Sequence, residues 1–142
     1  MKNLFMAIVV MVFATPSFAQ TGTVTVNVLG IENNKGVVRI GLYHNKESFP
    51  IYEKAMFKDV SEKANTTGVS YTFSKILEGT YAVAVWHDEN EDKTLNKNFL
   101  GAPKENYGFS KNIFGTFGPP DFEEVSFEVK NGKMVKLTII LE

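Results

Sequence analysis

The chain of 142 residues contains no cysteine, which excludes disulfide bonds, thiolate metal sites, a lipidated cysteine and a cysteine nucleophile. It also lacks an excess of positive charge, since its formal net charge is -1. Binding to a phosphate backbone needs a basic surface, so we expect no nucleic-acid partner. Charged residues make up 22% and hydrophobic residues 44% of the chain. This composition is typical of a folded domain and not of a disordered segment.

Common catalytic motifs are missing as well. No serine stands in a nucleophile elbow, and the chain has no glycine-rich phosphate loop and no dinucleotide fingerprint. One enzymatic alternative rests on the two histidines: if their strand ends are neighbours, His44, His87 and Asp88 would form the metal site of a small hydrolase. The competing interpretation is that His87 donates a hydrogen bond to a nearby carbonyl and holds a loop. We favour the second interpretation and predict no catalytic residue.

One uncharged apolar run stands out, and it lies at the N-terminus. Lys2 precedes the run over residues 4–14, and small residues follow where a signal peptidase cuts. The run is shorter than the ~20 residues that a bilayer span needs. We therefore predict that residues 1–19 are a signal peptide cleaved after Ala19. The mature chain, 20–142, would be periplasmic or secreted and would have no transmembrane segment.

Most of the remaining chain alternates between apolar and polar residues. The alternation runs through five segments, 23–28, 37–42, 69–74, 124–129 and 135–141. Such a period of two, with β-branched and aromatic residues on the apolar face, predicts half-buried antiparallel strands. By contrast, residues 81–86 are apolar at every position. They predict a central strand that is covered on both faces.

Turn sequences separate these segments at 33–36, 78–79 and 131–132, where Asn and Gly tolerate the left-handed conformation. We predict an all-β fold, a single antiparallel β-sandwich of about seven strands with long loops. A barrel is the alternative. Residues 47–64 form the one segment in which we expect a helix.

A polar loop follows the predicted central strand, with carboxylates and amides at positions 1, 3, 5 and 9: Asp88, Asn90, Asp92 and Asn96. Calcium takes six to eight oxygen ligands, and side chains at this spacing in a tight loop converge on one ion. With the main-chain carbonyl of Thr94 as a further ligand, the loop at 88–98 predicts a calcium site. We expect no other cofactor.

An EF-hand is excluded, because a strand and a loop flank these residues. Lys93 occupies the position of the EF-hand glycine, and Phe99 that of its bidentate glutamate. The alternative is a solvated hairpin tip, since Asp and Asn favour turns through local hydrogen bonds. Both interpretations of the loop stay open.

A second loop, residues 101–121, is rich in glycine, proline and aromatic residues. Loops of this length are uncommon inside a compact domain and are often functional. We expect a ligand surface that consists of His87, Glu105, Tyr107 and Phe109. Stacking of Trp86, Tyr107 and Phe109 would suit a saccharide. The alternative that we favour is that the loop aromatics pack as a small core of their own, because large apolar side chains are costly to leave in water.

Several motifs follow one another along the chain: Gly79-Thr80-Tyr81-Ala82, His87-Asp88-Glu89-Asn90, Gly101-Ala102-Pro103-Lys104-Glu105 and Tyr107-Gly108-Phe109-Ser110. In this order they resemble DUF2141, a family of small exported bacterial proteins of unknown function. The resemblance covers nearly all of the mature chain and implies a sandwich of the transthyretin-like, Greek-key or immunoglobulin-like kind. In the family pattern Asp-x-Asn-x-Asp is often followed by Gly and then by Leu-Asp-x-Asn. Lys93 and Asn96 replace that Gly and that Asp here, and the second replacement removes one charge from an ion site.

Together these observations predict an exported β-sandwich protein that acts as a binding or cell-envelope module, with a calcium loop at 88–98, rather than an enzyme. Its partner would be an envelope protein or a saccharide. The hydrolase built on the two histidines and a carbohydrate-binding module built on the loop aromatics are the alternatives.

Overall fold

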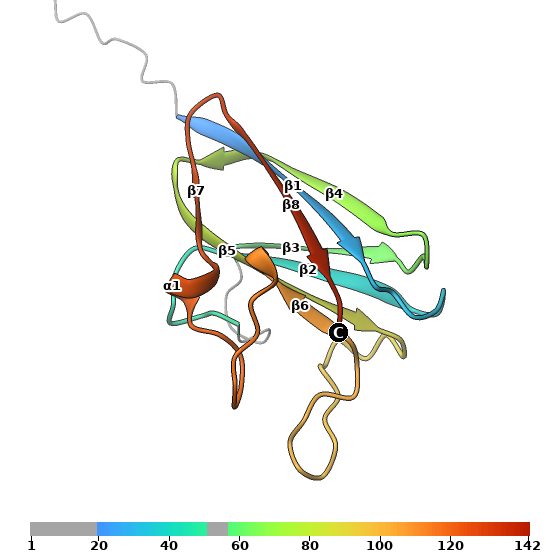
Figure 1. Cartoon of the computed structure of the whole chain (residues 1–142). Helices are drawn as coiled ribbons and strands as arrows, with labels where there is room; N and C mark the ends of the chain where they lie inside the picture. Colours follow the sequence, from blue (N-terminus) through green and yellow to red (C-terminus); the bar gives the residue numbers. More distant parts are fainter. Residues whose placement is uncertain (1–19, 51–56) are drawn as a thin grey trace, which may run out of the picture.

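The structure is a computed structural model, and it describes residues 20–50 and 57–142. The predicted signal peptide, 1–19, lies outside the described residues, as does the stretch 51–56 of the segment in which we expected a helix. The described chain is almost entirely β-structure, in two sheets that are mostly antiparallel (Figure 1). The prediction of an all-β fold is confirmed.

The first sheet has the strand order β4-β1-β8, and the second has the order β3-β2-β5-β6, with β7 paired to β5 beside this path. The strands are β1 (Thr21–Leu29), β2 (Val37–Tyr43), β3 (Lys58–Lys63), β4 (Val69–Leu77), β5 (Gly79–Asp88), β6 (Tyr107–Phe109), β7 (Phe127–Val129) and β8 (Met134–Ile140). A 3-10 helix η1 (Ser110–Asn112) and a short helix α1 (Phe122–Val125) follow β6. Within 20–50 and 57–142, no helix has the length and apolar character needed to cross a membrane.

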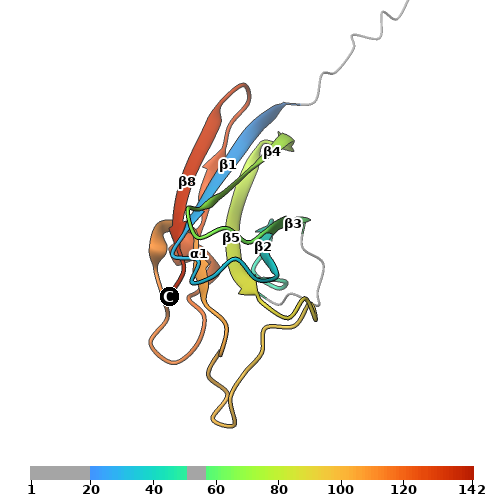
Figure 2. The same ribbon diagram turned by 90° about the vertical axis from the view of Figure 1, so that its right-hand side faces the viewer.

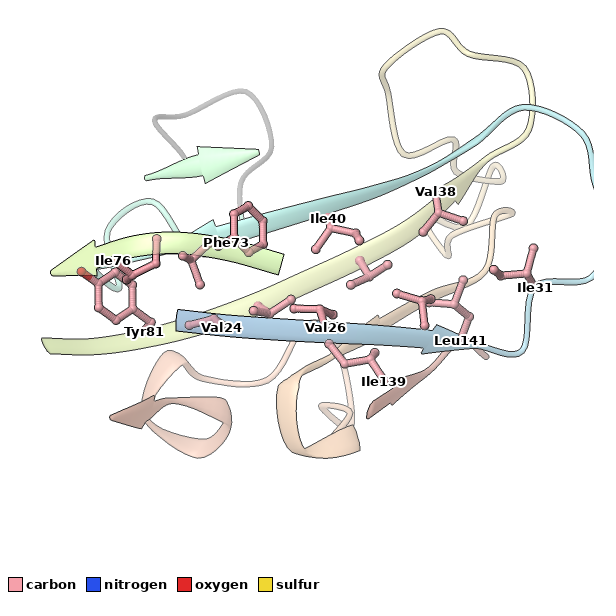
Figure 3. Close-up of a cluster of buried hydrophobic side chains, with 14 of the residues drawn as sticks. Val24, Val26, Ile31, Val38, Ile40, Phe73, Ile76, Tyr81, Ile139 and Leu141 are labelled. Atoms are coloured by element: carbon pink, nitrogen blue, oxygen red, sulfur yellow. The ribbon is translucent and has the colours of Figure 1, made fainter. Parts of the chain in front are cut away.

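A shared hydrophobic core lies between the two sheets (Figure 3). Alternate residues of β1 point into it, among them Val24 and Val26, which are completely buried. Phe73 and Ile139 join them from the neighbouring strands of the first sheet, and Ile40 comes from the facing sheet. The period of two in the sequence is therefore the period with which side chains alternate between this core and the outer faces.

Strand β5 is covered on both faces, as its unbroken apolar sequence predicted. From Tyr81 onwards every residue is buried. One set of alternate residues enters the shared core, and the other set packs in a second cluster, the outer cluster, which consists of Tyr43, Phe49, Ala82, Ala84, Phe109 and Val125. Phe114 packs against the outer cluster. The favoured interpretation of the second loop as a small core of its own thus holds for its residues Phe109 and Phe114.

The helix expected over 47–64 is wrong at 58–63, which form strand β3. This strand is mostly exposed, with a single partly buried apolar residue, Val60. It pairs with β2 at the edge of the sheet, with Val60 opposite Ile40. Main-chain hydrogen bonds to β2 hold it, so the side chains carry no alternation from which it could be recognised.

Two other expectations about the C-terminal half need correction. Of the strand expected over 124–129, residues 124 and 125 belong to helix α1, and only 127–129 form a strand. The carboxylate of Glu124 accepts the N–H of Asp121 at 2.9 Å, which closes the turn that starts the helix. The loop 101–121 is interrupted by β6 and η1. Short-range hydrogen bonding decided the first case and pairing to β5 the second.

The C-terminus joins the two sheets and holds β6 in place. Tyr107 and Glu142 exchange two main-chain hydrogen bonds of 3.0 and 3.2 Å, while the N–H of Leu141 donates to Leu29 at 2.9 Å. Gly108 fits here because a Cβ atom would lie 2.8 Å from a side-chain carbon of Ile139. The two long loops of the structure, residues 89–106 between β5 and β6 and residues 113–121 between η1 and α1, extend from this same end of the sheets (Figures 1 and 2).

Two neighbouring isoleucines of β8 test the position of the core. Ile139 is completely buried, whereas Ile140 is 46% exposed. We expect Ile139→Ala to lower the free energy of unfolding by about 2–5 kcal/mol, because it leaves a cavity between the sheets. Ile140→Ala should cost less than about 1 kcal/mol. Urea unfolding of both variants measures the difference, and equal losses would contradict the register of β8.

Candidate functional site

The carboxylate of Asp88, at the end of β5, is completely buried and forms an ion pair. The β2–β5 register pairs Arg39 with Trp86, which places both on the same face as Asp88. Arg39 Nε lies 2.5 Å from Asp88 Oδ2. The same guanidinium donates to the hydroxyl of Ser61 at 2.8 Å and stands 5.9 Å from the ring centre of Trp86. One cation thus compensates the buried carboxylate and connects β2, β3 and β5.

Asp88 also sets the first turn of the polar loop. Its Oδ2 accepts the main-chain N–H of Lys93 at 3.0 Å. Both Lys93 and Glu91 adopt the left-handed conformation, with φ of 67° and 58°. Asp88 Oδ1 is buried and has no hydrogen-bond partner in the described part of the chain. One oxygen of this carboxylate is therefore bound by the protein, and the other is left without a hydrogen bond.

Asn90, Asp92 and Asn96 bring their side chains together at the surface of the loop. Oδ2 of Asp92 accepts hydrogen bonds from the amides of Asn90 (2.9 Å) and Asn96 (3.0 Å). Oδ1 accepts the main-chain N–H of Thr94 at 2.8 Å. The hydrogen bonds from Asn96, Thr94 and Asn90, in that order, lower the pKa of Asp92 because they stabilise its ionised form. Three of the five expected calcium ligands are thus adjacent.

Glu105 is turned towards the interior, not towards an exposed ligand surface. Its side chain accepts the main-chain N–H of Asn96 at 2.9 Å. Burial is the main reason why the pKa of Glu105 is raised, and the negative charges of Asp88 and Asp92 raise it further. Main-chain hydrogen bonds from Asn96 and Glu89 act in the opposite direction. The carboxylates of Asp88 and Asp92 therefore repel the carboxylate of Glu105, which lies where the chain returns to the sheet.

Within the described residues, no three side chains of His, Cys, Asp or Glu lie close enough together to hold a metal ion. A cation in this loop would have to be held largely by amide and main-chain oxygens together with one or two carboxylates. Calcium accepts such a mixed set of oxygen ligands, whereas transition metals favour imidazole or thiolate. The donor chemistry of the loop therefore fits a hard cation.

The two histidines lie at opposite ends of β5. The ring of His44 lies 5.0 Å from that of Tyr81, and its Nδ1 is 3.3 Å from the carbonyl oxygen of Thr80. His87 is buried, and its Nε2 is 2.7 Å from the carbonyl oxygen of Lys35. The strand between them spans about 20 Å. One metal ion cannot bind both rings, so the hydrolase alternative is wrong. His87 instead holds the turn at Lys35.

A cleft of about 840 Å³ lies between the two long loops. It is lined by Pro50, residues 93–97, Gly101, Pro103, Tyr107, Phe109 and residues 117–119. Among these described residues, Lys93 and Lys97 are charged and none bears a carboxylate. Aromatic rings and prolines beside two ammonium groups favour a ligand with an apolar surface and a negative charge.

The expected ligand surface is only half formed. Tyr107 and Phe109 line the cleft, whereas His87 and Glu105 face the interior. Trp86 and Phe109 are 2% and 3% exposed. The rings of Tyr107 and Phe109 are inclined by 72°. A saccharide platform needs at least two exposed rings that are nearly coplanar, so the carbohydrate-binding alternative on these three residues is wrong.

Two features of the site were not predicted from the sequence. Arg39, the partner of Asp88, is the only arginine in the chain and the one charged residue within an otherwise apolar strand. Such an isolated cation could have indicated a buried anion. Phe117, expected to pack with the other loop aromatics, is fully exposed. The close approach of Gly115 to Gly118 makes the tight turn that leaves it in solvent.

Comparison with known proteins identifies the family. The model of a family described as an uncharacterized protein conserved in bacteria (DUF2141) matches residues 26–136. The matched range begins in β1 and ends in β8, so it includes both long loops and the cleft. No curated protein and no solved structure matches the chain.

The raised pKa of Glu105 predicts a distinct pH dependence of stability. Because the fold disfavours ionised Glu105, its contribution to the free energy of unfolding should fall as the pH rises from the ordinary glutamate pKa through the raised value. Urea unfolding of wild type and Glu105→Gln between pH 4 and 7 measures this contribution as a difference. We expect the difference to decrease over this window and then to level off. An increase with pH would show that the pKa is lowered.

Proposed function

We propose that this chain, which belongs to the DUF2141 family, is an exported β-sandwich binding module whose loop at 88–98 takes a calcium ion. The ligand-binding surface in this proposal is the cleft between the two long loops. Residues 93–97 belong both to the polar loop and to the lining of the cleft. A cation that orders the loop would therefore also shape the surface that meets a ligand.

The observation that carries the proposal is the second oxygen of Asp88. A buried carboxylate oxygen without a hydrogen bond is costly, and a bound cation would satisfy it. Asp88 Oδ2 is already held by Arg39 and by the N–H of Lys93, so the carboxylate has one orientation. An ion at Oδ1 would meet a ligand that is positioned in advance.

The surrounding charges support the same proposal. Hydrogen bonds lower the pKa of Asp92, and repulsion from Asp88 and Asp92 contributes to the raised pKa of Glu105. A divalent cation among these groups would relieve the repulsion. The amide oxygens of Asn90 and Asn96 and the carbonyl of Thr94 would complete the ligand set. With few carboxylates, the affinity would be modest.

Thermal unfolding in calcium and in chelator tests the cation site. At a calcium concentration about a hundred times Kd, the native state should gain about 2.7 kcal/mol. For a domain of this size, we expect the Tm to rise by about 10 °C. Asp88→Asn should abolish the rise in Tm, because it removes the negative charge of the carboxylate whose Oδ1 would bind the ion.

The measured quantity is the calcium-dependent difference in Tm, since Asp88→Asn also leaves Arg39 without its anion and lowers the Tm in chelator. Glu91→Gln is the matched control: it removes a charge from the same loop at a residue outside the proposed ligand set, and should keep the rise. An unchanged Tm of the wild type in millimolar calcium would refute the cation site, as would a rise that survives Asp88→Asn.

The export half of the proposal has a separate test. The chain expressed in an exporting bacterial host should be isolated with Gln20 as its first residue, as read by intact-mass spectrometry. Ala19→Phe places a large side chain where signal peptidase needs a small one, so this variant should retain residues 1–19. A wild-type protein that keeps Met1 would contradict the predicted cleavage.

A further inference from the structure

Three large apolar side chains at the ends of the two long loops are exposed to solvent. Phe99 is 94%, Leu100 is 78% and Phe117 is 103% exposed. They stand on two separate turns that extend from the same end of the sheets in both views (Figures 1 and 2). Large apolar side chains gathered at one end of a molecule mark a surface that meets another apolar phase.

The end of the first loop, here called the first tip, is a hydrogen-bonded hairpin over residues 96–104. The N–H of Lys104 donates to the carbonyl of Asn96, and the N–H of Asn98 donates to that of Ala102, both at 2.8 Å. The side chain of Asn98 accepts the N–H groups of Leu100 at 2.9 Å and of Ala102 at 3.1 Å. These hydrogen bonds hold the turn that presents Phe99 and Leu100, so their exposure is imposed by the local structure.

The second tip is a tight turn around Phe117. A Cβ atom on Gly115 would lie 2.3 Å from the carbonyl oxygen of Gly118, so only glycine allows the chain to fold back this closely. The turn directs Phe117 away from the outer cluster, against which Phe114 packs. Residues of both loops line the cleft, Phe117 among them.

The charges near the tips are of one sign. Residues 93–104 contain Lys93, Lys97 and Lys104 and neither aspartate nor glutamate, and residues 113–119 carry no charge. The acidic residues of the first loop are Glu89, Glu91 and Asp92, which precede the hairpin, and Glu105, which follows it and is buried. Protruding apolar residues backed by lysines are the combination that enters the interface of an anionic bilayer, with the ammonium groups at the level of the headgroups.

We infer that this end of the molecule is a lipid-contacting surface, on which Phe99, Leu100 and Phe117 enter the interface of an anionic bilayer while the lysines of the hairpin meet its headgroups. A bilayer accommodates the two separate tips without a specific shape, whereas a protein partner would need two apolar pockets at a matching distance. The inference does not rest on the proposed calcium site, because the hairpin is held by its own hydrogen bonds.

Co-sedimentation with vesicles tests the inference, and a chelator in the buffer removes any effect of calcium. Wild type and variants are all purified from the same exporting host, so that every protein has the same N-terminus. Wild type should bind vesicles of equal parts phosphatidylglycerol and phosphatidylcholine more tightly than vesicles of phosphatidylcholine alone. The double variant Phe99→Ser/Leu100→Ser should lower the partition coefficient by about tenfold or more. Lys97→Gln should lower it by about fivefold.

The matched control is Leu77→Ser/Met134→Ser. These residues are 49% and 57% exposed, and they lie opposite Thr21 and Thr23, at the end of β1 that is far from the loops. This variant should bind vesicles like wild type. All variants should keep the wild-type Tm within a few degrees, since the substituted side chains are exposed.

Two results would overturn the inference. The first is equal vesicle binding by wild type and Phe99→Ser/Leu100→Ser. The second is absence of binding by wild type to the phosphatidylglycerol vesicles. If sedimentation without vesicles then reveals self-association that Phe99→Ser/Leu100→Ser abolishes, the tips contact a second copy of this chain and not a bilayer.

Discussion

The buried carboxylate of Asp88 needs compensation for its charge, and the arrangement at the end of β5 follows from how the chain provides it. An uncompensated carboxylate in this position would cost several kcal/mol. Arg39 supplies the cation from β2, and the N–H of Lys93 supplies a hydrogen bond from the loop. The cation also reaches Ser61 on β3 and Trp86 on β5. One charge therefore connects three strands at the point where the chain leaves the sheet.

The loops continue from this anchor. The hydrogen-bonded turn at Lys93 begins the part of the chain that lines the cleft, and Glu105 receives the N–H of Asn96 where the chain returns. On the other side, the outer cluster holds Phe109 and Phe114 on the face of β5. The tip at Phe117 is left free of that cluster. Both proposals, a cation in the loop and a bilayer at the tips, thus concern segments whose bases are fixed by β5.

Much of the fold could be predicted, because burial on one face of a sheet leaves a period of two in the sequence. This period predicts strands β1, β2, β4 and β8, whereas the unbroken apolar sequence of β5 predicts its burial on both faces. Strand β3 was not predicted, since an edge strand held by main-chain hydrogen bonds needs no apolar alternation. The parallel pairing of β1 with β8 also left no local signal, because partners distant in sequence meet only in the folded state.

At the site, the sequence by itself determined which oxygen-bearing residues occur at a spacing that lets them converge. The hydrogen bonds that join Asn90, Asp92 and Asn96 are local and agree with that spacing. Only the tertiary structure decided that Asp88 pairs with Arg39, that the two histidines lie apart, and that Phe117 is exposed while Phe109 is buried. The reason is physical: local spacing governs contacts within one turn, whereas burial and charge compensation depend on which distant strands pair with β5.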